Sequence, residues 1–168
     1  ISYIEGNHEF RWKTLLNSKD GIQFKGLKHM TIREQLELDK LKIEYIECPG
    51  EEWFTTSVKV TDNFHIGHFS RCNAWPGYTA KNIQDRLCAG FITGHIHSGG
   101  VTHRRTANGI IWGYEGGCLC RLDPPYCDPV NWTQMIHVAH KESDESVEVE
   151  RININHGRAR YGGRLYSS

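Results

Sequence analysis

The order of the predicted elements constrains the fold more than any other feature of this sequence. Helix-like and strand-like stretches alternate over the first half, with helices expected over residues 8–16, 31–42 and 78–88. From residue 89 onward almost every regular stretch is β-prone, and Gly, Asn or Pro separates several of them. This order is typical of the α/β class. We therefore expect one α/β domain over residues 1–168, with residues 157–168 as an exposed tail rich in Arg and Gly.

The charge balance and the hydropathy narrow the class of protein. Lys and Arg together number 20, as do Asp and Glu, so the formal net charge is zero. A protein that coats nucleic acid through a broadly basic surface is therefore not expected, although a local basic groove is compatible with this balance. No apolar run approaches the ~20 residues that span a bilayer, and the first residues show no signal pattern. We expect a cytoplasmic protein with no membrane partner and with its six cysteines reduced.

Three short stretches that contain histidine lie at the ends of predicted strands. They are Gly6-Asn7-His8-Glu9, Ile66-Gly67-His68 and Gly94-His95-Ile96-His97. Side chains on loops that leave strand ends can converge on one site while the sheet holds them rigidly. Imidazole nitrogens and an amide oxygen are suitable ligands for Zn, Mn, Fe or Ni ions. Each stretch alone is compatible with an ordinary turn, but their conjunction at strand ends indicates a metal site.

The same three stretches resemble the later signature blocks of the calcineurin-like metallophosphoesterases. Residues 36–45, 77–80, 115–120 and 131–134 are similar to a bacteriophage-type branch of that superfamily, so the resemblance covers about residues 1–140. It implies a four-layer α/β/β/α sandwich with a two-metal centre at strand ends. It also implies a location in the cytoplasm of a bacterium or of a phage-infected host cell.

The resemblance assigns a role to each residue of the motifs. Asn7, His68 and His95 would bind one divalent ion. His97 would bind a second, and the ions would be Mn, Zn, Fe, Ni or Mg. His8 would be the catalytic residue, which stabilises the transition state or protonates the leaving oxygen. Two ions roughly 3.5–4 Å apart can activate a bridging water. The implied activity is hydrolysis of phosphate monoesters or diesters, a substrate class that includes nucleotides and nucleic acid.

Two departures from the family pattern affect these assignments. The middle block usually has Gly after its histidine, whereas Phe69 stands there, so His65 is a weaker competitor for that ligand position. The last block usually ends in Arg in this branch, whereas Ser98 occupies that place. A substrate-contacting arginine is therefore expected from elsewhere, and Arg104 and Arg105 are the candidates.

The family pattern opens with an Asp-x-His block and a Gly-Asp block, which supply the remaining ligands, including the carboxylate that bridges both metals. Neither block precedes Gly6 in this sequence. We therefore expect residues 1–168 to be the carboxy-terminal portion of the domain, inactive without an amino-terminal segment that supplies these ligands. The alternative from another functional class is a non-catalytic binding module with a metallophosphoesterase-like fold, which recognises nucleic acid or a protein.

The cysteines provide a rival metal site. Cys118, Cys120 and Cys127, together with His103 or His137, could form a structural zinc site of the Cys₃His type. Paired Cys-x-x-Cys spacing is absent, however, and loose spacing is weak evidence for such a site. We therefore expect buried or free thiols that bind no zinc.

Overall fold

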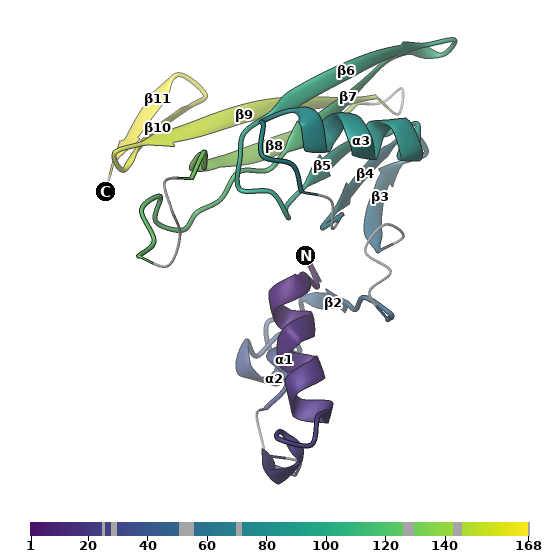
Figure 1. Cartoon of the computed structure of the whole chain (residues 1–168). Helices are drawn as coiled ribbons and strands as arrows, with labels where there is room; N and C mark the ends of the chain where they lie inside the picture. Colours follow the sequence, from purple (N-terminus) through teal and green to yellow (C-terminus); the bar gives the residue numbers. More distant parts are fainter. Residues whose placement is uncertain are drawn as a thin grey trace.

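The structure, a computed structural model, describes residues 1–24, 26–27, 30–50, 56–69, 72–125, 130–142 and 146–167, and its fold is mixed α/β (Figure 1). The elements along the chain are β1 (Ser2–Ile4), α1 (Asn7–Asn17), the 3₁₀ helix η1 (Ile22–Phe24), α2 (Ile32–Gln35), β2 (Glu44–Ile46), β3 (Ser57–Thr61), β4 (Phe64–Gly67), α3 (Tyr78–Leu87), β5 (Gly90–Thr93), β6 (Val101–Thr106), β7 (Gly109–Glu115), β8 (Met135–Lys141), β9 (Val147–Asn155), β10 (Arg158–Tyr161) and β11 (Arg164–Ser167).

A five-stranded sheet with the order β3-β4-β5-β7-β6 forms the centre of the molecule. β4, β5 and β7 run parallel to one another, whereas β3 and β6 pair antiparallel at the two edges. All four residues of β5 are buried, as expected for a strand in the middle of a covered sheet. Because the three central strands are parallel, their carboxyl ends meet at one edge of the sheet, and the loops that follow them are neighbours there.

Helix α3 covers one face of this sheet. Ala80 and Ile83 of the helix pack with Phe69 and Phe91 in the main hydrophobic cluster, and Leu87 lies against it. These helix residues follow the 3–4 residue spacing of one helical face. The sequence therefore predicts this helix and its buried face correctly.

Phe69, which directly follows His68, has a left-handed backbone with a φ of 37°. This conformation costs a residue with a Cβ about 1–2 kcal/mol, whereas glycine adopts it readily. The ring of Phe69 is fully buried and lies edge-on to Phe91, with 5.7 Å between the ring centroids. Burial of the ring thus stabilises a turn at a position where the metallophosphoesterase pattern usually has glycine.

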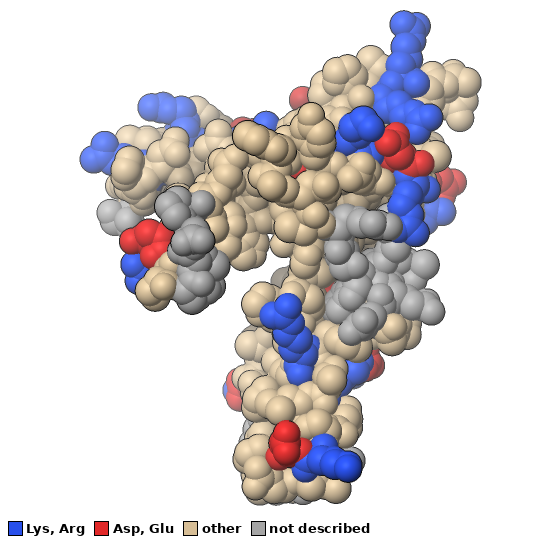
Figure 2. Space-filling view, viewed as in Figure 1, with Lys and Arg blue, Asp and Glu red and all other residues tan. Residues whose placement is uncertain are grey.

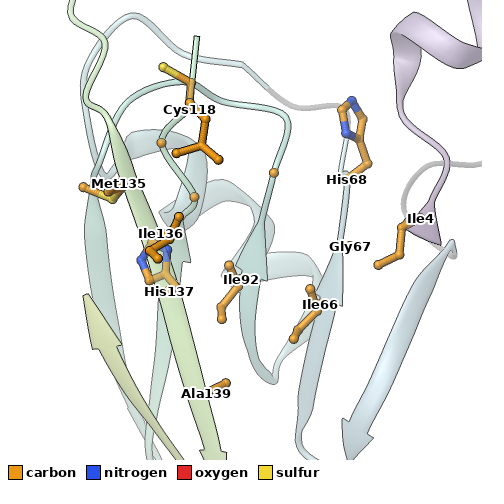
Figure 3. A pocket seen from close by; sticks show the side chains of 14 residues that line it. Ile4, Ile66, Gly67, His68, Ile92, Cys118, Met135, Ile136, His137 and Ala139 are labelled. Carbon is orange, nitrogen blue, oxygen red and sulfur yellow. The ribbon is translucent and has the colours of Figure 1, made fainter. Parts of the chain in front are cut away.

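The opposite face of the five-stranded sheet is turned toward β8. Successive residues of a strand point to opposite faces, so Ile92 points away from α3 while Phe91 packs against it. Ile66 and Ile92 line a cavity of about 760 Å³ together with Ile136 and Ala139 of β8 (Figure 3). β8 belongs to a second sheet of four strands, with the order β11-β10-β9-β8.

Residues 158–167, within the predicted tail, form a β-hairpin. β10 pairs antiparallel with both β9 and β11, so the hairpin extends the four-stranded sheet. Most of its residues are exposed. The sequence pattern therefore predicts the exposure of this segment but misses its strands, because exposed Arg- and Gly-rich strands lack an apolar alternation.

The amino-terminal elements form a unit that stands off from the two larger sheets (Figure 1). In it β1 and β2 pair in parallel, with Tyr3 opposite Tyr45. The predicted helix over residues 31–42 is wrong beyond its first turn. Its capping box is present, since Glu34 N donates to Thr31 Oγ1 and Thr31 N donates to Glu34 Oε2. Glu37 then has a left-handed backbone with a φ of 50°, and the helix ends before it. The next residue, Leu38, is buried.

Charged side chains are distributed over the surface in a mixed pattern. Figure 2 shows Lys and Arg scattered over several elements, with Asp and Glu beside several of them. The described part of this face thus carries no continuous basic surface. No helix in the described ranges combines the length and the apolar character needed to cross a membrane.

Candidate metal site

The carboxyl edge of the central parallel strands carries the predicted site. His68 follows β4, and His95 and His97 follow β5, its parallel neighbour. Asn7 and His8 begin α1, directly after β1. A pocket of about 570 Å³ is lined by all five of the predicted catalytic and metal-binding residues, which are Asn7, His8, His68, His95 and His97. Ligand sites of open α/β sheets lie at such an edge.

Three polar atoms of Asn7 and His95 crowd around one ring nitrogen of His68. His68 Nε2 lies 2.9 Å from Asn7 Oδ1, 2.9 Å from His95 Nδ1 and 3.2 Å from the backbone nitrogen of Asn7. A ring nitrogen carries either one hydrogen or one lone pair, so hydrogen bonding satisfies at most one well-aligned partner. The convergence of Asn7, His68 and His95 is therefore poorly explained by hydrogen bonds alone.

The spacing of these donors fits a shared metal ion. Metal–nitrogen and metal–oxygen bonds of roughly 2.1 Å place adjacent octahedral ligands about 3.0 Å apart. The separations of 2.9 Å between His68 Nε2 and its partners Asn7 Oδ1 and His95 Nδ1 are close to that value. Two imidazoles and an amide oxygen suit Mn, Fe, Ni or Zn. The three residues that the sequence motifs single out are thus compatible with one divalent ion.

The electrostatics keep the imidazoles in the form that binds metal. Burial, followed by the neighbouring His95, lowers the pKa of His68 to about 4. Burial is also the main cause that lowers the pKa of His95 and of His97, and nearby imidazoles, including His8, contribute to both. Neutral imidazole is the ligand form, so these histidines are ready to bind a cation at neutral pH.

The start of α1 fits closely against His68. A Cβ on Gly6 would lie 2.9 Å from His68 Cε1, so this position requires glycine. Glu9 fixes the turn, because its carboxylate accepts hydrogen bonds from Gly6 N at 2.9 Å and from Tyr3 Oη at 2.8 Å. Burial and this contact with Glu9 raise the pKa of Tyr3 to about 12. Gly6 and Glu9 thus hold Asn7 against His68.

The loop after β5 is fixed by a buried carboxylate at the end of β7. Glu115 is fully buried, and it accepts hydrogen bonds from Ser98 Oγ at 2.7 Å and from Gly100 N at 3.0 Å. Its other oxygen accepts from Ala80 N of α3 at 3.1 Å. Ser98, which stands where the family branch has Arg, therefore positions the loop that carries His97.

The two arginines predicted to contact substrate lie outside the pocket. Arg104 pairs with Asp85 of α3 at 3.4 Å, and Arg105 lies beside it on β6 with an exposed side chain. Arg11 lines the pocket instead. It follows His8 by three positions on α1, and residues at this spacing share a helix face. The helix period could therefore have indicated Arg11.

The remaining histidine candidates for metal binding lie outside this pocket and have other partners. His65 Nδ1 lies 3.3 Å from Ser57 Oγ, and His65 does not line the pocket among the described residues. His103 packs on Trp112 and His137 on Tyr114, with ring centroids 5.0 Å and 5.8 Å apart respectively. Cys127 lies outside the described residues.

Comparison of the chain with protein-family models, with curated proteins and with solved structures gives no match. The resemblance to metallophosphoesterases therefore depends on the sequence motifs alone.

Proposed function

We propose that this protein is a metal-dependent phosphoesterase of the calcineurin-like type, with two divalent ions at the carboxyl edge of its parallel strands. The observation that carries this proposal is the crowding of Asn7 Oδ1 and His95 Nδ1 around His68 Nε2. The position of His8 and His97 in the same pocket supports it. The glycine-like backbone of Phe69 is a further feature in its favour.

Each residue has a distinct task in this proposal. Asn7, His68 and His95 hold the first ion, and His97 contributes to the second. The pair of ions supplies a metal-activated water and neutralises charge on the phosphoryl oxygens. His8 protonates the leaving oxygen, and the guanidinium of Arg11 contacts the phosphate. Phosphate monoesters, nucleotides and nucleic-acid diesters are all included in this substrate class.

In this proposal a further polypeptide segment supplies the carboxylate that bridges the two ions. Among the described residues that line the pocket Glu9 alone is acidic, and both of its oxygens already accept hydrogen bonds. Two cations at close range repel strongly unless a carboxylate bridges them. Within the described residues the parallel sheet of β1 and β2 has two strands, whereas parallel sheets usually have more. The additional segment would supply both and complete a four-layer sandwich.

The function is tested by assaying p-nitrophenyl phosphate and bis(p-nitrophenyl) phosphate with residues 1–168, alone and joined to the additional segment. We expect turnover of ~1–10³ s⁻¹ for the joined protein, loss of it in EDTA and recovery with Mn²⁺. The turnover of residues 1–168 alone is expected to be far below this rate. Ordinary turnover by residues 1–168 alone would show that no further segment is needed. Bound metal without turnover in the joined protein would favour the binding module.

A further inference from the structure

Two cysteines of the loop after β7 lie beside His97. A ring nitrogen of His97 and the sulfurs of Cys118 and Cys120 are all within 4.8 Å of one another. Among the described residues, this is the one group of three or more His, Cys, Asp or Glu side chains whose ligand atoms lie this close together. From the sequence we expect these thiols to bind no metal, and the histidine partners named there for a rival zinc site are His103 and His137. The third ligand is instead a histidine of the predicted phosphoesterase motif.

Backbone hydrogen bonds hold the three ligands in place. Thr133 N donates to His97 O at 2.9 Å, and Cys118 N donates to Thr133 O at 3.0 Å. Gln134 Nε2 donates to Cys120 O at 2.8 Å, and Cys118 forms a parallel bridge with Gln134. The segment around residue 133 thus forms hydrogen bonds with both loops that carry the ligands, so the fold holds the three ligands together.

The donor chemistry of this cluster differs from that of the first site. Thiolate with imidazole favours zinc-class ions, whereas the amide oxygen of Asn7 suits harder ions such as Mn²⁺. Tetrahedral zinc with Zn–S bonds of about 2.3 Å places two sulfurs about 3.8 Å apart, a spacing that falls within the 4.8 Å limit of the present cluster. Nδ1 of His97 is a buried atom with no hydrogen-bond partner among the described residues, which is consistent with a lone pair kept for a ligand.

We propose that His97, Cys118 and Cys120 bind one zinc-class ion, with a fourth position open to solvent or substrate. The site lies next to the first one. His97 lines the same pocket as Asn7. Cys118 and His68 both line the cavity of about 760 Å³ between the sheets (Figure 3). The inference depends on the proposed function for the role of this ion as the second metal of the pair. The binding of the ion does not depend on it.

Cobalt titration of the reduced protein tests this site without an activity readout. We expect wild-type protein to develop the intense near-ultraviolet charge-transfer absorbance of Co²⁺ bound by thiolates, and Zn²⁺ to displace it. Cys118→Ser and Cys120→Ser should each lose most of that absorbance. His97→Ala should weaken Co²⁺ binding at least about tenfold, since even outer-shell partners are worth 10–100-fold. Cys88→Ser is the matched control, because Cys88 is exposed and distant in sequence from these loops, and it should leave the absorbance unchanged.

Circular dichroism of each metal-free variant checks that it is folded. Absorbance that survives in both serine variants, or no thiolate absorbance in the reduced wild-type protein, would overturn the site. Thiolate-bound cobalt together with no phosphate-ester hydrolysis by the joined protein would support the site and contradict the proposed function. Metal-dependent hydrolysis without thiolate absorbance would contradict the site and support the proposed function.

Discussion

Replacement of His8 by Asn should lower the turnover of the active protein by 10²–10⁴-fold and leave its metal content nearly unchanged. His8 lines the pocket beside Asn7, His68 and His95, yet it takes no part in the close contacts among them. Asn keeps some hydrogen-bonding capacity but cannot donate a proton as an acid. The measurements are kcat on a phosphate ester and metal content by elemental analysis.

The control for this substitution is His103→Asn, since His103 packs on Trp112 away from the pocket. It should leave kcat within about twofold of the wild-type value, because surface substitutions are usually near neutral. A loss below about tenfold for His8→Asn would reduce His8 to a positioning role. A loss of metal from that variant would make it a ligand instead.

Replacement of Glu115 by Ala should destabilise the protein by about 3–5 kcal/mol. The substitution leaves Ser98 Oγ, Gly100 N and Ala80 N without their acceptor in a buried place, and each unsatisfied group costs about 1–3 kcal/mol. Because Ser98 belongs to the loop that carries His97, the binding of zinc-class metal should weaken in the same variant. Urea unfolding measures the first effect, and cobalt titration the second.

Two substitutions calibrate that result. Glu115→Gln keeps the shape and one acceptor oxygen, so its loss of stability should be smaller than that of Glu115→Ala. Glu150→Ala removes an exposed carboxylate of β9 and should change the free energy of unfolding by no more than about 0.5 kcal/mol. Equal stability of Glu115→Ala and Glu150→Ala would show that the buried network contributes little.

Local features of this fold are readable from the sequence because they depend on neighbouring residues. The 3–4 residue spacing predicts α3 and its buried stripe, and the capping box of Thr31 and Glu34 marks the start of α2. The histidine motifs are recognised by their places after strand-like stretches. The end of α2 is not readable in this way, because burial of Leu38 and a left-handed Glu37 override the helical period.

Contacts between distant segments were beyond sequence reasoning. Asn7 and His68 meet across 61 positions, and only a resemblance to a known pattern pairs them in advance. His97 lies beside Cys118 and Cys120 because the loops after β5 and β7 are adjacent. That adjacency is set by the order of the strands in the sheet, which the sequence pattern does not give. Arg104 and Arg105 were the sequence candidates for substrate contact, whereas Arg11 lines the pocket, because the position of α1 beside the pocket depends on tertiary structure.

The most direct test of the account is Mn²⁺ binding by residues 1–168, followed through the loss of the paramagnetic resonance signal of free Mn²⁺. Mn²⁺ reports the site of Asn7, His68 and His95, because it prefers oxygen and nitrogen ligands to thiolates. We expect saturable binding of one ion per chain, weakened at least about tenfold in Asn7→Leu and in His95→Ala but unchanged in Cys118→Ser. Equal Mn²⁺ binding by the wild type, Asn7→Leu and His95→Ala, or no binding by any of them, would contradict the account.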